Sequence, residues 1–118
     1  MPEQTAVLDR VFKALSDPTR RQVVERLVVG AASTSELARP FAMALPSFTQ
    51  HLDVLERAGL VTSTKTGRVR TYELVPAALG EADGWLAEQR RLWQRRLDQL
   101  DELLTTLTTD TPQTLEQP

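Results

Sequence analysis

The spacing of apolar residues changes twice along this chain, and these changes limit the folds that it can adopt. Up to Gly59, apolar residues recur every three or four positions, which is typical of amphipathic helices. From Val61 to Leu74 the chain is rich in β-branched residues around a short turn, Lys65 to Arg68, which is typical of a hairpin. Helical spacing returns after Gly80. The sequence therefore predicts a mainly α-helical chain with one small β-hairpin.

Four helices are predicted before the hairpin, and residues with known end preferences mark their limits. Small polar residues favour the position before a helix, and proline favours its first turn. Glycine favours the position after a helix, and a proline farther along a helix stops it. The first predicted helix is Gln4 to Leu15, and the second starts at Pro18, after Asp17, and ends near Gly30. The third is short, begins after Ser33 or Thr34 and stops at Pro40. The fourth runs from Pro46 to Gly59.

The length of 118 residues corresponds to one ordinary domain, and the hydrophobic content of 41% is close to the average of globular proteins. No apolar run approaches the roughly 18 residues that suggest a membrane span. Residues 1–10 lack a basic region followed by an apolar stretch, so we expect no secretory signal. These features predict a protein without a membrane partner that stays in the cytoplasm.

Cysteine is absent and His51 is the single histidine. Disulfides, thiolate metal sites and cysteine nucleophiles are therefore excluded, and too few side chains remain for a zinc site or a catalytic triad. We expect neither catalytic residues, nor metal ligands, nor a cofactor.

The order of the predicted elements is that of a winged helix-turn-helix: several helices, then a helix with a polar face, then a hairpin. Opposite its apolar residues, the fourth predicted helix carries hydroxyl, amide, imidazole and guanidinium groups. Such groups can read base edges in the DNA major groove, although a solvated helix face often has the same composition. We expect contacts to double-stranded DNA from Ser47, Thr49, Gln50, His51 and Arg57. His51 can instead serve as a local structural hydrogen-bonding group.

The predicted hairpin is basic at its tip. Lys65 and Arg68 can reach DNA backbone phosphates from there. Arg70 can do the same, or it can lay its stem over the core, because it shares strand parity with Tyr72. Arg20 is a further candidate phosphate contact, since the N-terminus of the second helix favours anions.

Charge is distributed unevenly along the chain. Residues 17–70 contain eight basic and five acidic residues, whereas residues 71–118 contain four basic and nine acidic residues. The middle of the chain therefore suits contact with phosphate. The acidic final third and the net charge of −2 favour an alternative, a winged-helix module that binds another protein.

Leucine and tryptophan recur after Gly80 at spacings of seven, four, three, four and three, which is typical of a coiled-coil seam. A helix from about Glu81 to Thr106 would be about 39 Å long, more than a small domain can cover. We expect a homodimer joined by this seam and by the first helix, through Val7, Val11, Leu86, Trp93, Leu97, Leu100 and Leu104.

Two alternatives concern the end of the chain. Trp85 and Trp93 can line an apolar effector pocket instead of an interface. Residues 108–118 have little to bury and are predicted to form a disordered tail. The predicted domain therefore covers residues 1–107, with its dimerisation helix at about 80–107.

Three stretches resemble the ArsR/SmtB family of bacterial repressors. They are Ala14-Leu15-Ser16-Asp17-Pro18-Thr19-Arg20-Arg21, the run from His51-Leu52 through Leu55-Glu56-Arg57-Ala58-Gly59-Leu60-Val61, and Gly67-Arg68 followed by Tyr72-Glu73-Leu74. The resemblance covers about residues 5–107. It implies a winged helix-turn-helix dimer, joined by its first and last helices, that represses its own operon. We therefore expect a sequence-specific repressor with one recognition helix in each half of an inverted-repeat operator.

The stretch Phe41 to Pro46 and the spacing of Trp85-Leu86 and Leu92-Trp93 resemble a subgroup of that family without metal sites. The family's metal sensors carry cysteines on the third helix, or histidine and carboxylates on the last, and neither set is present here. Ala44 also stands where a serine cap is expected. The sequence leaves open whether a small-molecule effector is sensed.

Overall fold

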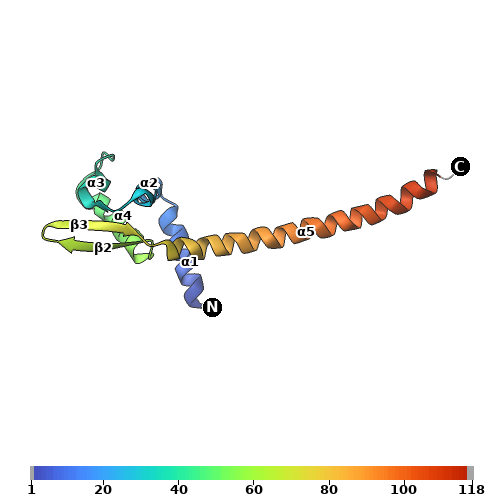
Figure 1. Cartoon of the computed structure of the whole chain (residues 1–118), viewed down its shortest axis with the longest axis horizontal. Helices are drawn as coiled ribbons and strands as arrows, with labels where there is room; N and C mark the ends of the chain where they lie inside the picture. Colours follow the sequence, from blue (N-terminus) through green and yellow to red (C-terminus); the bar gives the residue numbers. More distant parts are fainter. Residues whose placement is uncertain (1, 117–118) are drawn as a thin grey trace. The chain divides into compact units, whose positions relative to one another are not determined.

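A computed structural model describes residues 2–116, and the side chains of residues 5–108. The chain divides into two units, Met1–Asp83 and Gly84–Pro118. The helices and strands are α1 (Pro2–Leu15), α2 (Pro18–Val29), β1 (Ala32–Ser33), α3 (Thr34–Ala38), α4 (Leu45–Arg57), β2 (Val61–Thr66), β3 (Val69–Leu74) and α5 (Pro76–Glu116) (Figure 1). The predicted class, mainly α-helical with a β-hairpin, is confirmed.

Local capping explains where the first helices begin. The Oδ2 atom of Asp17 accepts a hydrogen bond of 3.1 Å from the Arg20 N–H and caps α2. At α3, Ser33 is the cap, and it exchanges hydrogen bonds with Glu36 in a capping box. Ala44 precedes α4 and provides no side-chain cap, because its methyl group has no atom that can accept a hydrogen bond.

The core of the first unit lies between α1, α2, α3, α4, the three-stranded sheet and the first turns of α5. Its largest fully buried side chains are Phe48, Leu37, Leu52, Leu55, Leu60, Val11 and Val23. The prediction that Val11 lies at a dimer interface is therefore wrong, because Val11 is 0% exposed within its own chain. Apolar spacing identifies a buried helix face without identifying what buries it.

The three strands form an antiparallel sheet in the order β1-β3-β2. Strand β1 was not predicted, because two residues carry no periodicity and only the pairing of Ala32 with Tyr72 defines it. Strand β2 continues to Thr66, so Lys65 pairs with Arg70 in the ladder and does not lie in the turn. The loop consists of Gly67, with φ of 64°, and Arg68, an arrangement typical of a type II′ turn.

Helix α5 starts earlier than the sequence predicts. It begins at Pro76 and contributes Ala78 and Ala82 to the core of the first unit. Its backbone continues to Glu116. The disordered tail expected from residue 108 stays a prediction. Residues 117 and 118 lie outside the described residues. No helix in the described part is apolar enough over 18 residues to cross a membrane.

Candidate nucleic-acid interface

Helix α4 turns one face to the core and leaves the opposite face open. Phe48, Leu52 and Leu55 are fully buried, and the Phe48 ring packs against Phe41 with centroids 5.4 Å apart. This packing fixes the rotation of α4 about its own axis. The polar residues on the other face are therefore held in a defined orientation.

The N-terminal half of that open face carries three of the predicted base contacts. Ser47 and Gln50 are exposed and lie three residues apart, so they are neighbours on one side of α4. The Thr49 hydroxyl donates to the Pro46 carbonyl oxygen at 3.0 Å, and its oxygen keeps lone pairs that can accept. Arg57 is exposed in the last turn, about 10 Å farther along the axis than Gln50, so it does not join this group.

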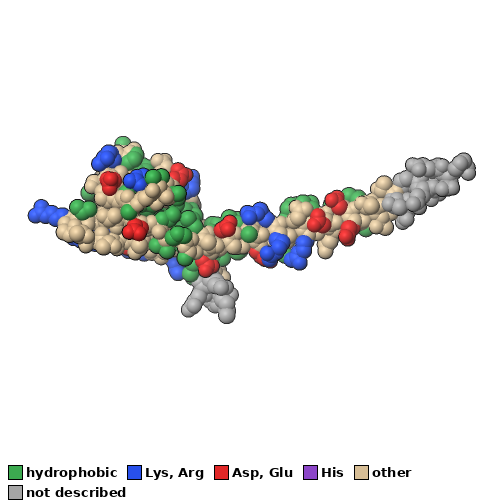
Figure 2. Space-filling model, in the orientation of Figure 1, with side chains coloured by type: hydrophobic (Ala, Val, Ile, Leu, Met, Phe, Trp, Pro, Cys, Tyr) green, Lys and Arg blue, Asp and Glu red, His purple; other side chains and the backbone are tan. Residues whose placement is uncertain are grey.

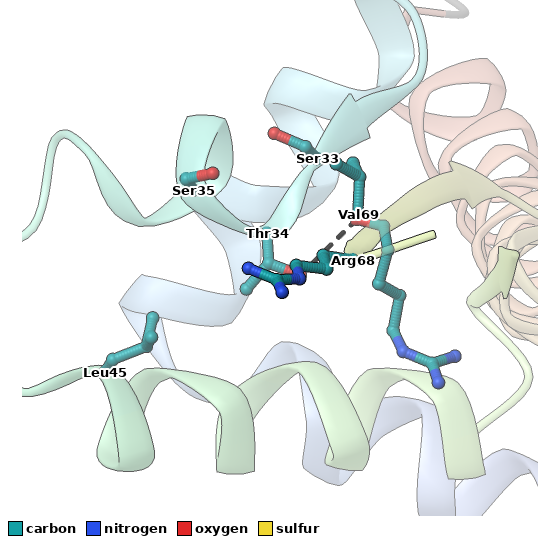
Figure 3. A pocket seen from close by; sticks show the side chains of 7 residues that line it. Ser33, Thr34, Ser35, Leu45, Arg68 and Val69 are labelled. Atoms are coloured by element: carbon teal, nitrogen blue, oxygen red, sulfur yellow. Dashed lines mark hydrogen bonds between the residues drawn. The ribbon is translucent and has the colours of Figure 1, made fainter. Parts of the chain in front are cut away.

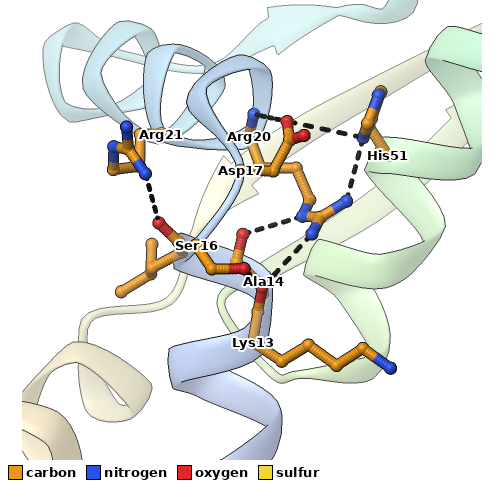
Figure 4. Close-up of polar contacts among 8 residues, drawn as sticks. Lys13, Ala14, Ser16, Asp17, Arg20, Arg21 and His51 are labelled. Atoms are coloured by element: carbon orange, nitrogen blue, oxygen red, sulfur yellow. Dashed lines mark hydrogen bonds and ion pairs between the residues drawn. The ribbon is translucent and has the colours of Figure 1, made fainter.

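His51 lies beside these residues but faces inward. Its side chain is 23% exposed, and its Nδ1 atom lies 3.0 Å from Nη1 of Arg20 and 3.8 Å from Oδ2 of Asp17 (Figure 4). Of the two roles that the sequence leaves open for His51, these contacts favour the structural one.

Arg20 is engaged inside the domain. Its guanidinium donates to the carbonyl oxygens of Ala14 at 2.7 Å and Lys13 at 3.2 Å, both at the end of α1, and to His51. Beside it, partial burial acts to raise the pKa of Asp17, but the hydrogen bond from the Arg20 N–H and the nearby positive charge of Arg20 outweigh this effect. The pKa of Asp17 is therefore lower than its usual value.

The hairpin, or wing, contains the remaining predicted cations. Lys65 and Arg68 are exposed, and Figure 2 shows Lys and Arg side chains in blue at the hairpin tip. Arg70 is linked to α4: its Nη1 donates to the Ser63 hydroxyl at 2.9 Å, which in turn donates to Oε2 of Glu56 at 2.9 Å. Arg70 is thus held by side-chain hydrogen bonds at the base of the wing, whereas no such bond to α4 is formed by Arg68 in the described part of the chain.

A cavity of about 340 Å³ lies where α3, the start of α4 and the wing meet (Figure 3). Three hydroxyl groups, two guanidinium groups and two apolar side chains surround it, and none of the described residues that line it is acidic. The lining residues are Ser33, Thr34, Ser35, Leu45, Arg68, Val69 and Arg70. Hydroxyl and guanidinium donors without a carboxylate form a setting that suits a phosphate group.

No group of three potential metal-binding side chains occurs among the residues whose side chains the structure describes. Because the sequence also contains no cysteine, the thiolate sites of the family's metal sensors cannot form.

The predicted dimer residues on α5 are exposed within the second unit. Leu86, Trp93, Leu97, Leu100 and Leu104 are between 38% and 62% exposed. Figure 2 shows hydrophobic side chains in green between charged ones along this helix. Val7, on α1, is half-buried and packs against the core of the first unit. An apolar stripe of this kind is typical of a surface that another protein covers.

Sequence reasoning missed Glu56, Ser63 and the hydroxyl groups around the cavity. Ser63 follows Glu56 by seven residues across a helix end and a turn, so no periodic signal joins them. Pairing of β2 with β3 places Ser63 opposite Tyr72 and diagonal to Arg70, which completes the link.

Comparison with known proteins gives the same result from an independent direction. Residues 15–64 match the family described as a helix-turn-helix domain. The chain is 38% identical to the HTH-type transcriptional regulator Rv2034 of Mycobacterium tuberculosis, over 87% of this chain and 94% of the relative. It is 32% identical to the transcriptional repressor SdpR of Bacillus subtilis, over 67% of this chain and 88% of the relative.

Two solved structures are similar to it as well. A crystal structure of an ArsR family transcriptional regulator, RHA00566, has a TM-score of 0.74 and 49% identity, and covers 80% of this chain and 94% of that one. The homodimeric winged helix-turn-helix DNA-binding domain of Mb0332 from Mycobacterium bovis has a TM-score of 0.57 and 26% identity, with coverage of 76% and 82%.

The order of elements, the three-stranded sheet and the open face of α4 define a winged helix-turn-helix protein. The similarity to the relatives described above identifies the family within this class. The chain belongs to the ArsR family of transcriptional regulators. The resemblance found in the sequence is therefore confirmed. The relatives are named as regulators of transcription, which agrees with the prediction that the protein is not an enzyme.

Proposed function

We propose that this protein is a homodimeric repressor that binds an inverted-repeat DNA operator, with one α4 helix in the major groove of each half-site. The observation that carries this proposal is the open face of α4, where Ser47 and Gln50 are exposed, together with the exposed cations Lys65 and Arg68 of the wing. Amide and hydroxyl groups read base edges, whereas exposed cations contact phosphates without reading sequence. Half-sites about one helical turn apart suit such a dimer.

The wing and the cavity supply the backbone contacts in this proposal. Lys65 and Arg68 are exposed and no carboxylate is paired with them in the described part of the chain. The cavity between α3 and the wing offers hydroxyl groups beside Arg68. A phosphate at this cavity would place the wing along the DNA backbone next to the groove that α4 reads.

The exposed apolar stripe of α5 supports the homodimer. Mb0332, whose winged helix-turn-helix domain is homodimeric, is similar to this chain in fold and at 26% identity. A second copy would remove Leu97, Leu100 and Leu104 from water, which is favourable for each buried apolar surface.

Repression is proposed by analogy with SdpR, which is named as a transcriptional repressor. A regulator that acts on bacterial chromosomal DNA works in the cytoplasm, and we place the protein there. The absence of cysteine from the sequence argues that its inducing signal is not a thiolate-bound metal ion.

The experiment that tests this function selects duplexes from a randomised library with the full-length protein. It then compares the selected duplex with a scrambled duplex, near physiological salt, with and without a chelator. We expect a preference of about a thousandfold or more that the chelator does not change. Gln50→Ala should reduce this preference, whereas Arg68→Ala should weaken both duplexes alike and lower the salt dependence. A library that yields no preferred sequence would contradict the proposal and favour the protein-binding module instead.

A further inference from the structure

We propose that Arg20 is a positioning residue for the recognition helix and does not itself contact DNA. Through His51, it sets the angle at which α4 presents Ser47 and Gln50. This inference rests on the proposed function, because it assigns a residue that tunes the reading of DNA by α4. It replaces the phosphate contact that the position of Arg20 in the sequence suggests.

The guanidinium of Arg20 bonds to two helices at once. Nε and Nη2 donate to Ala14 and Lys13 carbonyl oxygens at the C-terminal end of α1, and Nη1 lies 3.0 Å from Nδ1 of His51 on α4 (Figure 4). The last carbonyl groups of a helix lack partners within the helix, so they are strong acceptors for a cation.

The chemistry of the pair fixes the state of His51. Arginine has only donors, so Nδ1 of His51 must be the acceptor, and the ring proton lies on Nε2. Asp17 holds the start of α2, which carries Arg20, because its Oδ2 accepts from the Arg20 backbone N–H at 3.1 Å. Since Arg20 itself lies on α2, three helices meet at one guanidinium.

The place of this link on α4 gives it influence over DNA reading. His51 directly follows Gln50 and lies one helical turn after Ser47. The guanidinium is a rigid planar group, so bonds to α1 and to His51 limit how far α4 can tilt relative to α1. Precise placement matters, because hydrogen bonds to base edges weaken steeply with poor geometry.

The test uses a duplex that the wild-type protein selects from a randomised library, and a scrambled duplex of equal composition. For Arg20→Met we expect the ratio of the two affinities to fall by about tenfold, the typical value of one hydrogen bond to a charged group. Affinity for the scrambled duplex and its salt dependence should remain unchanged. If the wild-type protein selects no sequence, the proposed function fails and not this inference alone.

Arg21→Met is the matched control. Arg21 also donates to a carbonyl oxygen of α1, that of Leu15 at 2.9 Å, and in the described part of the chain no hydrogen bond or ion pair joins it to α4. Arg21→Met should keep the wild-type ratio. Near-ultraviolet circular dichroism establishes that each variant is folded at the temperature of the binding assay.

A pair of His51 variants tests the link without altering the end of α1. His51→Asn retains an acceptor near the Nδ1 position and should keep most of the ratio, whereas His51→Leu should lose it. The Arg20→Met/His51→Leu double variant should be no worse than either single variant, since both remove one contact. If Arg20→Met does not fold, the two His51 variants still test whether the contact between Arg20 and His51 affects the ratio of the two affinities.

Three results would overturn the inference. The first is that Arg20→Met weakens binding to both duplexes equally and reduces the slope of log affinity against log salt by about 0.9, which is the signature of a direct phosphate contact. The second is that Arg20→Met leaves the ratio of the two affinities unchanged. The third is that His51→Asn and His51→Leu lose this ratio equally, which would mean that His51 reads DNA itself.

Discussion

At the scale of single residues, Asp17 combines two roles at the turn between α1 and α2. Its carboxylate caps α2 through the Arg20 N–H and stands beside the Arg20–His51 contact. Glu36 has a similar position at α3, where hydrogen bonds from the Ser33 N–H and hydroxyl hold the pKa of its carboxyl below the usual value. Short local hydrogen bonds thus fix the starts of α2 and α3.

Replacing Asp17 with Ala should lower the free energy of unfolding by about 1 kcal/mol at pH 7, the typical loss for an N-cap. The control Asp17→Asn keeps an acceptor and should lose less. Urea denaturation of the three proteins measures both effects. An alanine variant as stable as the wild type would show that the cap contributes nothing.

The same residue predicts a pH effect with a definite sign. Because the native pKa of Asp17 lies below its unfolded value, the stabilisation is complete above about pH 4 and disappears as the pH falls through the native pKa. Urea denaturation from pH 7 down to pH 3 should therefore show a steeper loss for the wild type than for Asp17→Asn. Parallel curves would contradict the assignment.

At the scale of elements, α4 begins without a side-chain cap. Ala44 is extended, with φ of −63° and ψ of 143°, and the second residue of α4, Pro46, has no N–H to offer. The N–H of Ser47 remains for a cap at the third position. The recognition helix thus starts without a side-chain cap, which a hydroxyl at position 44 can supply.

Ala44→Ser should therefore raise the free energy of unfolding by about 1 kcal/mol, because the new hydroxyl can accept from the Ser47 N–H. Ala42→Ser makes the same chemical change at an exposed position outside the cap. Thermal denaturation of both variants is the measurement. Equal melting temperatures for the two would show that the cap site does not limit stability.

The wing shows how pairing decides the fate of similar residues. Arg68 lies in the two-residue loop and is exposed, whereas Arg70 lies two residues later in β3 and reaches Ser63 on β2. Because Glu56 accepts from Ser63, the base of the wing is joined to α4 by side chains as well as by packing. Arg68, at the tip of the wing, remains exposed and available to contact phosphate.

At the scale of the whole molecule, the exposed stripe of α5 is the surface that a second copy would cover. Leu100→Glu should raise the dimer dissociation constant by about a hundredfold or more, since burying an unpaired charge costs roughly 3 kcal/mol or more. Gln99→Glu adds the same charge at the neighbouring position, off the seam. Sedimentation velocity at micromolar concentration compares the two, and identical profiles would exclude this stripe from the interface.

Much of the fold is predictable from the sequence because its signals are local. Asp17, Pro18 and Ser33 identify helix starts through bonds that span three residues, and the β-branched stretch after Gly59 identifies the hairpin. By contrast, β1 and the strand position of Lys65 depend on pairing with β3, and no residue near them in the sequence reveals it.

The sequence by itself determined the main helices, the hairpin, the winged helix-turn-helix class and the family, since periodicity, caps and short motifs act over a few residues. Only the tertiary structure decided which candidate side chains remain free. Arg20 meets a residue 31 positions away, and Arg70 one 7 positions away across a strand pair. Contacts of this kind depend on how helices and strands approach one another, which is a property of the packed core and not of any single segment.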